Sequence, residues 1–79
     1  MSYGYSARVV AANNRHDDSF IGVKLGRLCI AHDIPVSFVA SQLQVSRQTV
    51  YNWFVGAYEP HTKYRQSVEL FILTLEPKV

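Results

Sequence analysis

Residues 36–56 read VSFVASQLQVSRQTVYNWFVG, with apolar side chains at helical spacing on both sides of a short polar interruption. The apolar residues fit two short helices packed across a tight turn; they are Val39, Leu43, Val45, Val50 and Trp53. Ala40 is small enough to let the two helices approach each other. Ser46 is a suitable N-cap for the second helix. The segment therefore predicts a helix-turn-helix.

The second predicted helix carries a polar stripe opposite its apolar side, formed by Arg47, Gln48, Tyr51 and Asn52. A helix of this kind can enter the DNA major groove, where Arg suits guanine O6 and N7 and Gln suits adenine N6 and N7. We therefore predict Arg47 and Gln48, in the first turn, as the specificity pair. Asn52 is expected to contact a base or a phosphate, and Tyr51 a sugar or a thymine methyl group.

Between Ile34 and Tyr58 the only charged side chain is that of Arg47. No carboxylate would therefore repel phosphates along the predicted reading surface. The competing interpretation is that this stretch is simply well buried in a small helical bundle. Ser, Gln, Asn and Thr are interleaved throughout it, which favours a polar, uncharged face that meets DNA.

The order and spacing of nine residues in this segment resemble those of the Cro and lambda-repressor type of DNA-binding domain; the residues are Val39, Ala40, Leu43, Val45, Ser46, Thr49, Val50, Trp53 and Gly56. The resemblance covers residues 36 to 56 well and residues 20 to 75 loosely. It implies an all-α fold, a small bundle of four to five helices containing the helix-turn-helix. It also implies a sequence-specific regulator of repressor type that binds double-stranded DNA, of a size that phages and mobile elements encode.

Two positions depart from the pattern of that family. Gln44 stands where the family commonly has Gly, because the backbone there tends toward positive φ. Pro35 and Val36 stand where the family often has Ser and a phosphate-binding Gln, so Ser37, Gln42 or Thr49 would have to replace that contact. Further expected contacts to the DNA backbone are those of Ser46, Lys63 and Arg65.

Length and composition indicate one small globular domain. The chain has 79 residues, of which 48% are hydrophobic and 18% are charged, and its net charge of +2 argues against binding as a broad polycation. The single cysteine, Cys29, excludes an intramolecular disulfide and is expected in the core. No residue spacing indicates a metal site, a cofactor or a catalytic group, and no segment resembles a membrane span or a signal peptide. We expect a cytoplasmic protein that is not an enzyme.

Outside the central segment the chain divides into residues 1–17, an N-terminal arm, and residues 18–79, the DNA-binding domain. The arm lacks a sustained period and is either flexible or contains a short element. Asp18 and Ser19 are predicted N-caps for a helix that ends near residue 32 or 33. Within that helix Gly22 and Gly26 would permit close contact with another helix.

The last predicted helix follows the turn at Gly56 and residues 57–60. Its core face consists of Tyr64, Val68, Phe71, Ile72 and Leu75. Leu70 and Leu73 lie off that face, which indicates either a homodimer interface or a crowded core. A second function class uses the same leucines and the tyrosine-rich N-terminus: a small interaction protein whose helix-turn-helix scaffold binds a protein partner such as RNA polymerase or a toxin.

Overall fold

The computed structural model describes residues 5–17 and 19–76, and this part of the chain contains only helices. The helices are α1 (Ala7–Asn14), α2 (Ile21–Ala31), α3 (Val36–Leu43), α4 (Arg47–Phe54) and α5 (Thr62–Leu75). The expected all-α bundle of four to five helices is thus confirmed. In the described part, no helix is both long and apolar enough to cross a membrane.

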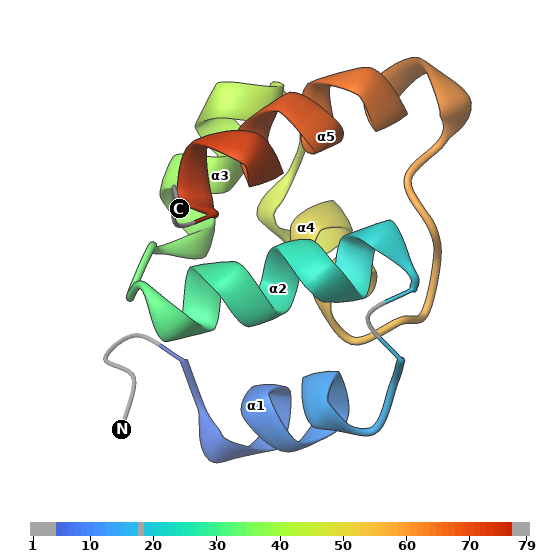
Figure 1. Cartoon of the computed structure of the whole chain (residues 1–79). Coiled ribbons are helices and arrows are strands. Elements are labelled where there is room, and N and C mark those ends of the chain that lie inside the picture. The colour runs from blue at the N-terminus through green and yellow to red at the C-terminus, as the bar shows by residue number, and fades with distance from the viewer. Residues whose placement is uncertain (1–4, 18, 77–79) are drawn as a thin grey trace.

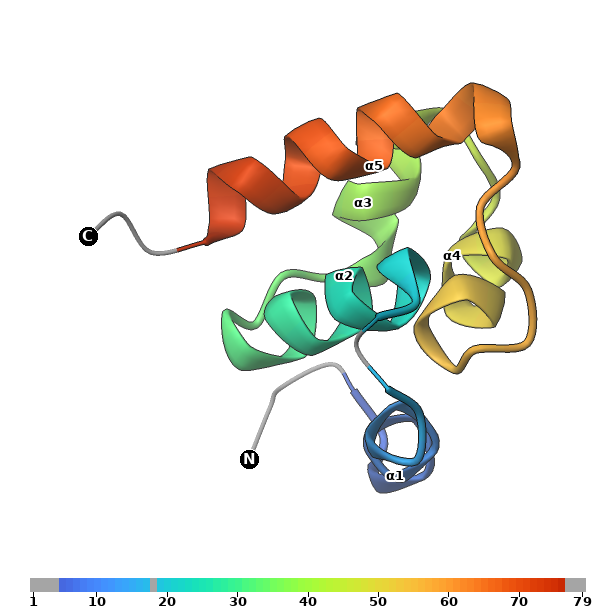
Figure 2. The ribbon, with the colours of Figure 1, turned by 45° about the vertical axis from the view of Figure 1, so that its right-hand side comes forward.

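Helix α2 occupies the centre of the bundle, with α1 and α5 on opposite sides of it (Figures 1 and 2). Helix α4 packs against α2, α3 and α1, whereas α5 packs against α2 and α3. The α3–α4 pair is the predicted helix-turn-helix. Its second helix packs on α1, α2 and α3, and the Trp53 ring lies 5.9 Å from the Tyr64 ring of α5.

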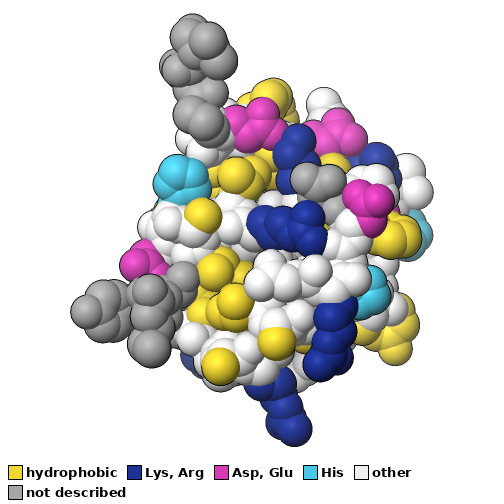
Figure 3. All heavy atoms as spheres, turned by 60° about the horizontal axis from the view of Figure 1, so that its bottom comes forward, with side chains coloured by type: hydrophobic (Ala, Val, Ile, Leu, Met, Phe, Trp, Pro, Cys, Tyr) yellow, Lys and Arg dark blue, Asp and Glu magenta, His cyan; other side chains and the backbone are white. Residues whose placement is uncertain are grey.

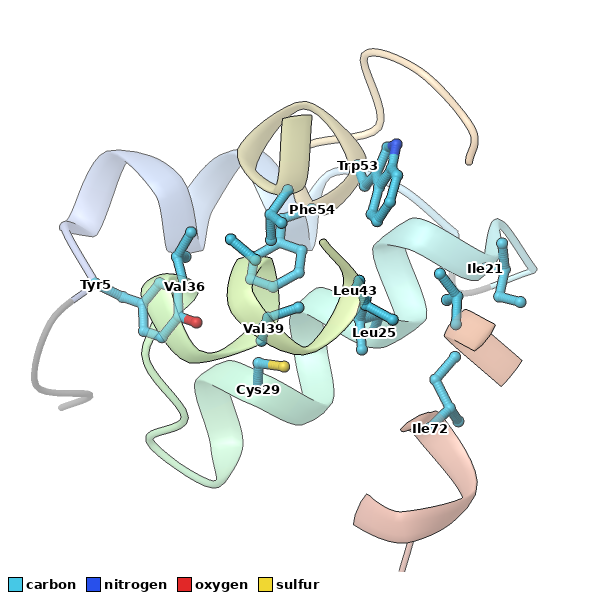
Figure 4. Packing of buried hydrophobic residues seen from close by; sticks show 13 residues of the cluster. Tyr5, Ile21, Leu25, Cys29, Val36, Val39, Leu43, Trp53, Phe54 and Ile72 are labelled. Carbon is cyan, nitrogen blue, oxygen red and sulfur yellow. The ribbon is translucent and has the colours of Figure 1, made fainter. Parts of the chain in front are cut away.

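The hydrophobic core fills the space between α2, α3, α4 and α5 (Figure 4). Its fully buried side chains include Phe54, Leu25, Val39, Val50 and Cys29. Because it is buried, the Cys29 thiol has its pKa raised to about 12, as expected for a small core residue. Trp53 is only 3% exposed, so its indole is part of the core.

Two glycines let α2 lie directly against α4. A Cβ atom on Gly22 would come within 2.8 Å of the Trp53 carbonyl oxygen. A Cβ atom on Gly26 would come within 2.9 Å of the Phe54 ring. The close helix contact predicted from these glycines is therefore present, and it sets the distance between the central helix and the second helix of the helix-turn-helix.

Residues 5–17 contain the short helix α1, which packs against α2 and α4. Ser6 is its N-cap and accepts a hydrogen bond from the Val9 N–H. Tyr5 is buried; its ring lies 6.1 Å from that of Phe54 and its hydroxyl donates to the Ile34 carbonyl. This part of the predicted arm is therefore integrated in the bundle, while residues 1–4 lie outside the described part.

The predicted N-cap of α2 is wrong. The helix begins at Ile21, and Phe20 occupies the N-cap position without a side-chain capping bond. Ser19 belongs to the preceding turn, where its N–H donates to Asp17 Oδ1 at 2.9 Å; Asp18 lies outside the described residues. At the start of α2 Ile21 is buried, 7% exposed, and the Gly22 N–H donates to Glu59 Oε1 at 3.5 Å, so the side chain that reaches the helix start comes from a distant part of the sequence.

Candidate nucleic-acid interface

The turn between α3 and α4 is a tight one in which Gln44 has left-handed backbone angles, φ 57° and ψ 46°. The Val45 N–H donates to the Ala40 carbonyl at 3.0 Å, and the Gln44 N–H donates to the Ser41 carbonyl at 3.3 Å. This pair of bonds is the Schellman motif, in which a left-handed residue closes a helix. The backbone expected of a glycine is therefore adopted by Gln44.

Ser46 begins α4 as its N-cap, as predicted. Its hydroxyl oxygen accepts a hydrogen bond from the Thr49 N–H at 3.1 Å and lies 2.8 Å from the Thr49 hydroxyl. The other N–H groups of the first turn are left at the positive end of the helix dipole. Ser46 and Thr49 thus organise the start of α4 through each other.

The four side chains of the predicted stripe all lie on α4, but they differ in exposure. Arg47 and Gln48 are exposed, whereas Tyr51 and Asn52 are half-buried. Tyr51 packs against the hydrophobic core. The Gln48 Nε2 group donates to Asn52 Oδ1 at 3.1 Å, so these two side chains are joined along the helix. The outermost groups of α4 are those of the predicted specificity pair.

The remaining predicted backbone contacts are spread over α3 and α5. Ser37 and Gln42 are exposed at opposite ends of α3. Lys63 and Arg65 are exposed in the first turn of α5, with the Lys63 amino group 5.1 Å from the Tyr64 ring centre. Arg65 Nε lies 3.2 Å from Glu69 Oε1, so a carboxylate offsets its charge.

Helix α5 also carries the two leucines that lie off its core face. Leu70 is 57% exposed and Leu73 is 63% exposed. Val68 and Ile72, on the opposite side of the helix, are buried. The alternative that Leu70 and Leu73 belong to a crowded core is therefore wrong for this chain, and their apolar surface faces outward.

Charge is unevenly distributed over the fold. Helices α1, α3 and α4 contain no Asp or Glu. The described carboxylate residues lie in the turns before and after α2, in the turn before α5 and on or after α5; they are Asp17, Asp33, Glu59, Glu69 and Glu76. The predicted reading helix itself therefore carries no negative charge that would oppose a phosphate backbone.

Sequence reasoning missed Asn13, which is 1% exposed. Its side-chain Nδ2 group donates to the Phe54 carbonyl at 2.7 Å and to the Val23 carbonyl at 3.1 Å. The Phe54 carbonyl belongs to the last residue of α4, where the helix itself supplies no donor. Asn13 thus ties α1 to the end of α4, and no sequence signal indicated that this polar side chain would be buried.

Comparison with known proteins found no matching family model, no matching curated protein and no matching solved structure. The resemblance to the Cro and lambda-repressor type therefore rests on the residue pattern of 36–56. Among the described residues, no three His, Cys, Asp or Glu side chains are grouped as a metal site would require.

Proposed function

We propose that this chain is a sequence-specific regulator of repressor type that binds double-stranded DNA through α4. The observation that carries the proposal is the exposed pair Arg47 and Gln48 at the capped start of α4, in a stretch whose only charged side chain is Arg47. A helix supported on its inner side by Val50, Trp53 and Phe54 can insert its outer side into the major groove without unfolding.

Each group at the start of α4 has a suitable partner on DNA. Arg47 can donate two hydrogen bonds to guanine, and Gln48 can both donate to and accept from adenine. Asn52 orients the Gln48 amide through their mutual hydrogen bond. The N–H groups of the first turn, with Ser37 and Gln42 on α3 and Lys63 at the start of α5, supply contacts to phosphates.

Selection of bound duplexes from a random pool, followed by competition between the selected duplex and random duplex, tests this function. The selected duplex should bind more tightly, and affinity should fall with salt in proportion to the phosphates neutralised. Arg47→Ala or Gln48→Ala should cost about 1–3 kcal/mol on the selected duplex and far less on random DNA. Gln66→Ala, at an exposed position on α5, is the matched control.

We further propose that two copies pair through the outward leucines of α5, Leu70 and Leu73. A two-fold dimer would present two α4 helices to an inverted repeat with half-sites about 10 base pairs apart. Leu70→Glu with Leu73→Glu should then give a folded monomer that binds a half-site weakly. Sedimentation showing a monomer both free and on DNA would overturn the dimer.

The second candidate function is binding of a protein partner, such as RNA polymerase or a toxin, through the same exposed leucines. It is favoured over the first if no duplex binds even at low salt. In that case Leu70→Glu should abolish partner binding, whereas Gln48→Ala should leave it unchanged.

A further inference from the structure

We propose that α1 is a second DNA-contacting element, whose exposed side binds phosphates of the strand that borders the groove entered by α4. The inference rests on the proposed function and extends it to a helix outside the helix-turn-helix. It assigns the phosphate contacts to Arg8 and Arg15.

The first argument is the side of α1 that faces solvent. Its exposed residues are Ala7, Arg8, Ala11 and Asn14, and the C-cap Arg15 that follows is exposed too. They lie on one side of the helix, because they follow one another at helical spacing, while Val9, Val10 and Asn13 face the bundle. Because the alanine side chains between them are small, a phosphate backbone can approach the two guanidinium groups without a steric clash. These groups stem from positions two turns, about 10 Å, apart and can reach different phosphates.

The second argument is charge. The chain has no Asp or Glu before Asp17, and no carboxylate of the described residues pairs with Arg8 or Arg15. By contrast, Lys24 Nζ lies 2.8 Å from Glu76 Oε1, on the side of α2 that meets α5. In the view that brings α1 forward, the centre and the lower edge of the face carry Lys and Arg side chains, whereas Lys and Arg alternate with Asp and Glu in its upper part and a further acidic side chain lies at the left margin (Figure 3).

The third argument is the fixed position of α1 beside α4. The Asn13 amide holds the last carbonyl of α4 at 2.7 Å, and Tyr5 packs on Phe54. Packed helices are separated by about 8–10 Å, and the major groove is about 12 Å wide. A helix packed at the end of α4 is therefore close enough to reach the sugar-phosphate strand that borders a groove entered by α4. Because α1 is held by buried contacts, its backbone needs no ordering when DNA binds, and only the two arginine side chains lose freedom.

The test compares the salt dependence of binding to the selected duplex. Arg8→Ala with Arg15→Ala should lower the slope of log affinity against log salt by about 2, since each lost phosphate contact removes about 0.9. The preference for the selected over random duplex should stay unchanged, because phosphates carry no sequence information. Arg8→Lys with Arg15→Lys should retain the slope, and Lys24→Ala should not alter it. Thermal unfolding of each variant checks that the fold is intact.

An unchanged slope and affinity in the Arg8→Ala, Arg15→Ala variant would overturn the inference while leaving the proposed function standing, provided Gln48→Ala still removes the preference. A loss of preference in that variant would also overturn it, since the arginines would then read bases. Failure of the unmodified protein to bind any duplex would refute both proposals.

Discussion

Replacement of Gln44 by glycine should stabilise the protein. Gln44 has φ 57° and ψ 46°, a conformation that costs a residue with a Cβ atom about 1–2 kcal/mol. Glycine avoids that cost but loses more backbone freedom on folding, which offsets about 0.5–1 kcal/mol. The side chain of Gln44 is exposed, so its removal opens no cavity. The free energy of unfolding should therefore rise by about 0.5–1 kcal/mol.

Thermal and denaturant-induced unfolding measure this change. For a domain of this size 1 kcal/mol corresponds to about 4–8 °C, so Gln44→Gly should raise the midpoint by about 2–8 °C. Gln66→Gly is the control, because Gln66 is exposed within α5 and should lose about 1 kcal/mol on the same substitution. The opposite signs of the two changes distinguish a conformational effect from a general effect of glycine.

A lower midpoint for Gln44→Gly would refute this reasoning. It would mean that the turn is not left-handed in solution, or that the Gln44 side chain makes a stabilising contact. A gain in both glycine variants would likewise contradict the assignment of strain to the turn.

Three further substitutions and one pH series test other parts of the structure. Gly22→Ala should destabilise by about 1–3 kcal/mol in denaturant unfolding, because the new Cβ would lie 2.8 Å from the Trp53 carbonyl oxygen, and backbone must shift. Asn13→Ala should cost a similar amount by the same assay, since it leaves the last carbonyl of α4 buried without its donor. Gln48→Glu should change the base selected opposite that side chain from adenine to cytosine, because a carboxylate can accept a hydrogen bond from the cytosine amino group. Selection of bound duplexes from a random pool measures this change. Burial raises the pKa of the Cys29 thiol from 9.0 to about 12. The contribution of the protonated thiol to the free energy of unfolding is therefore complete below pH 9 and should be lost as the pH rises from 9 to 12. Unfolding measured across this pH range should show a shallower decline in a Cys29→Ala variant.

Local rules were sufficient for most of the helix-turn-helix. The apolar spacing predicted the burial of Val39, Leu43, Val50 and Trp53, and all four are buried. Ser46 is the N-cap of α4, as predicted. Gly56, with φ 76°, follows the end of that helix, as the preference for glycine after a helix predicts. These features depend on residues within one or two turns of each other, so a single sequence contains the information that specifies them.

The elements that the sequence left undecided are those whose partners are distant along the chain. Asn13 is a polar residue in a segment without a clear period, and its hydrogen-bond acceptors are 10 and 41 residues away. Only their approach in the folded bundle makes its burial favourable and turns residues 7–14 into a packed helix. For Leu70 and Leu73, the helical period showed that they lie off the core face, but whether other helices would cover them depended on the placement of α5 against α2 and α3. The sequence by itself thus determined the bounds, the cap and the buried side of the predicted reading helix. The tertiary structure decided which side chains of the neighbouring helices are exposed beside it, because the exposure of a side chain depends on how all the helices pack together.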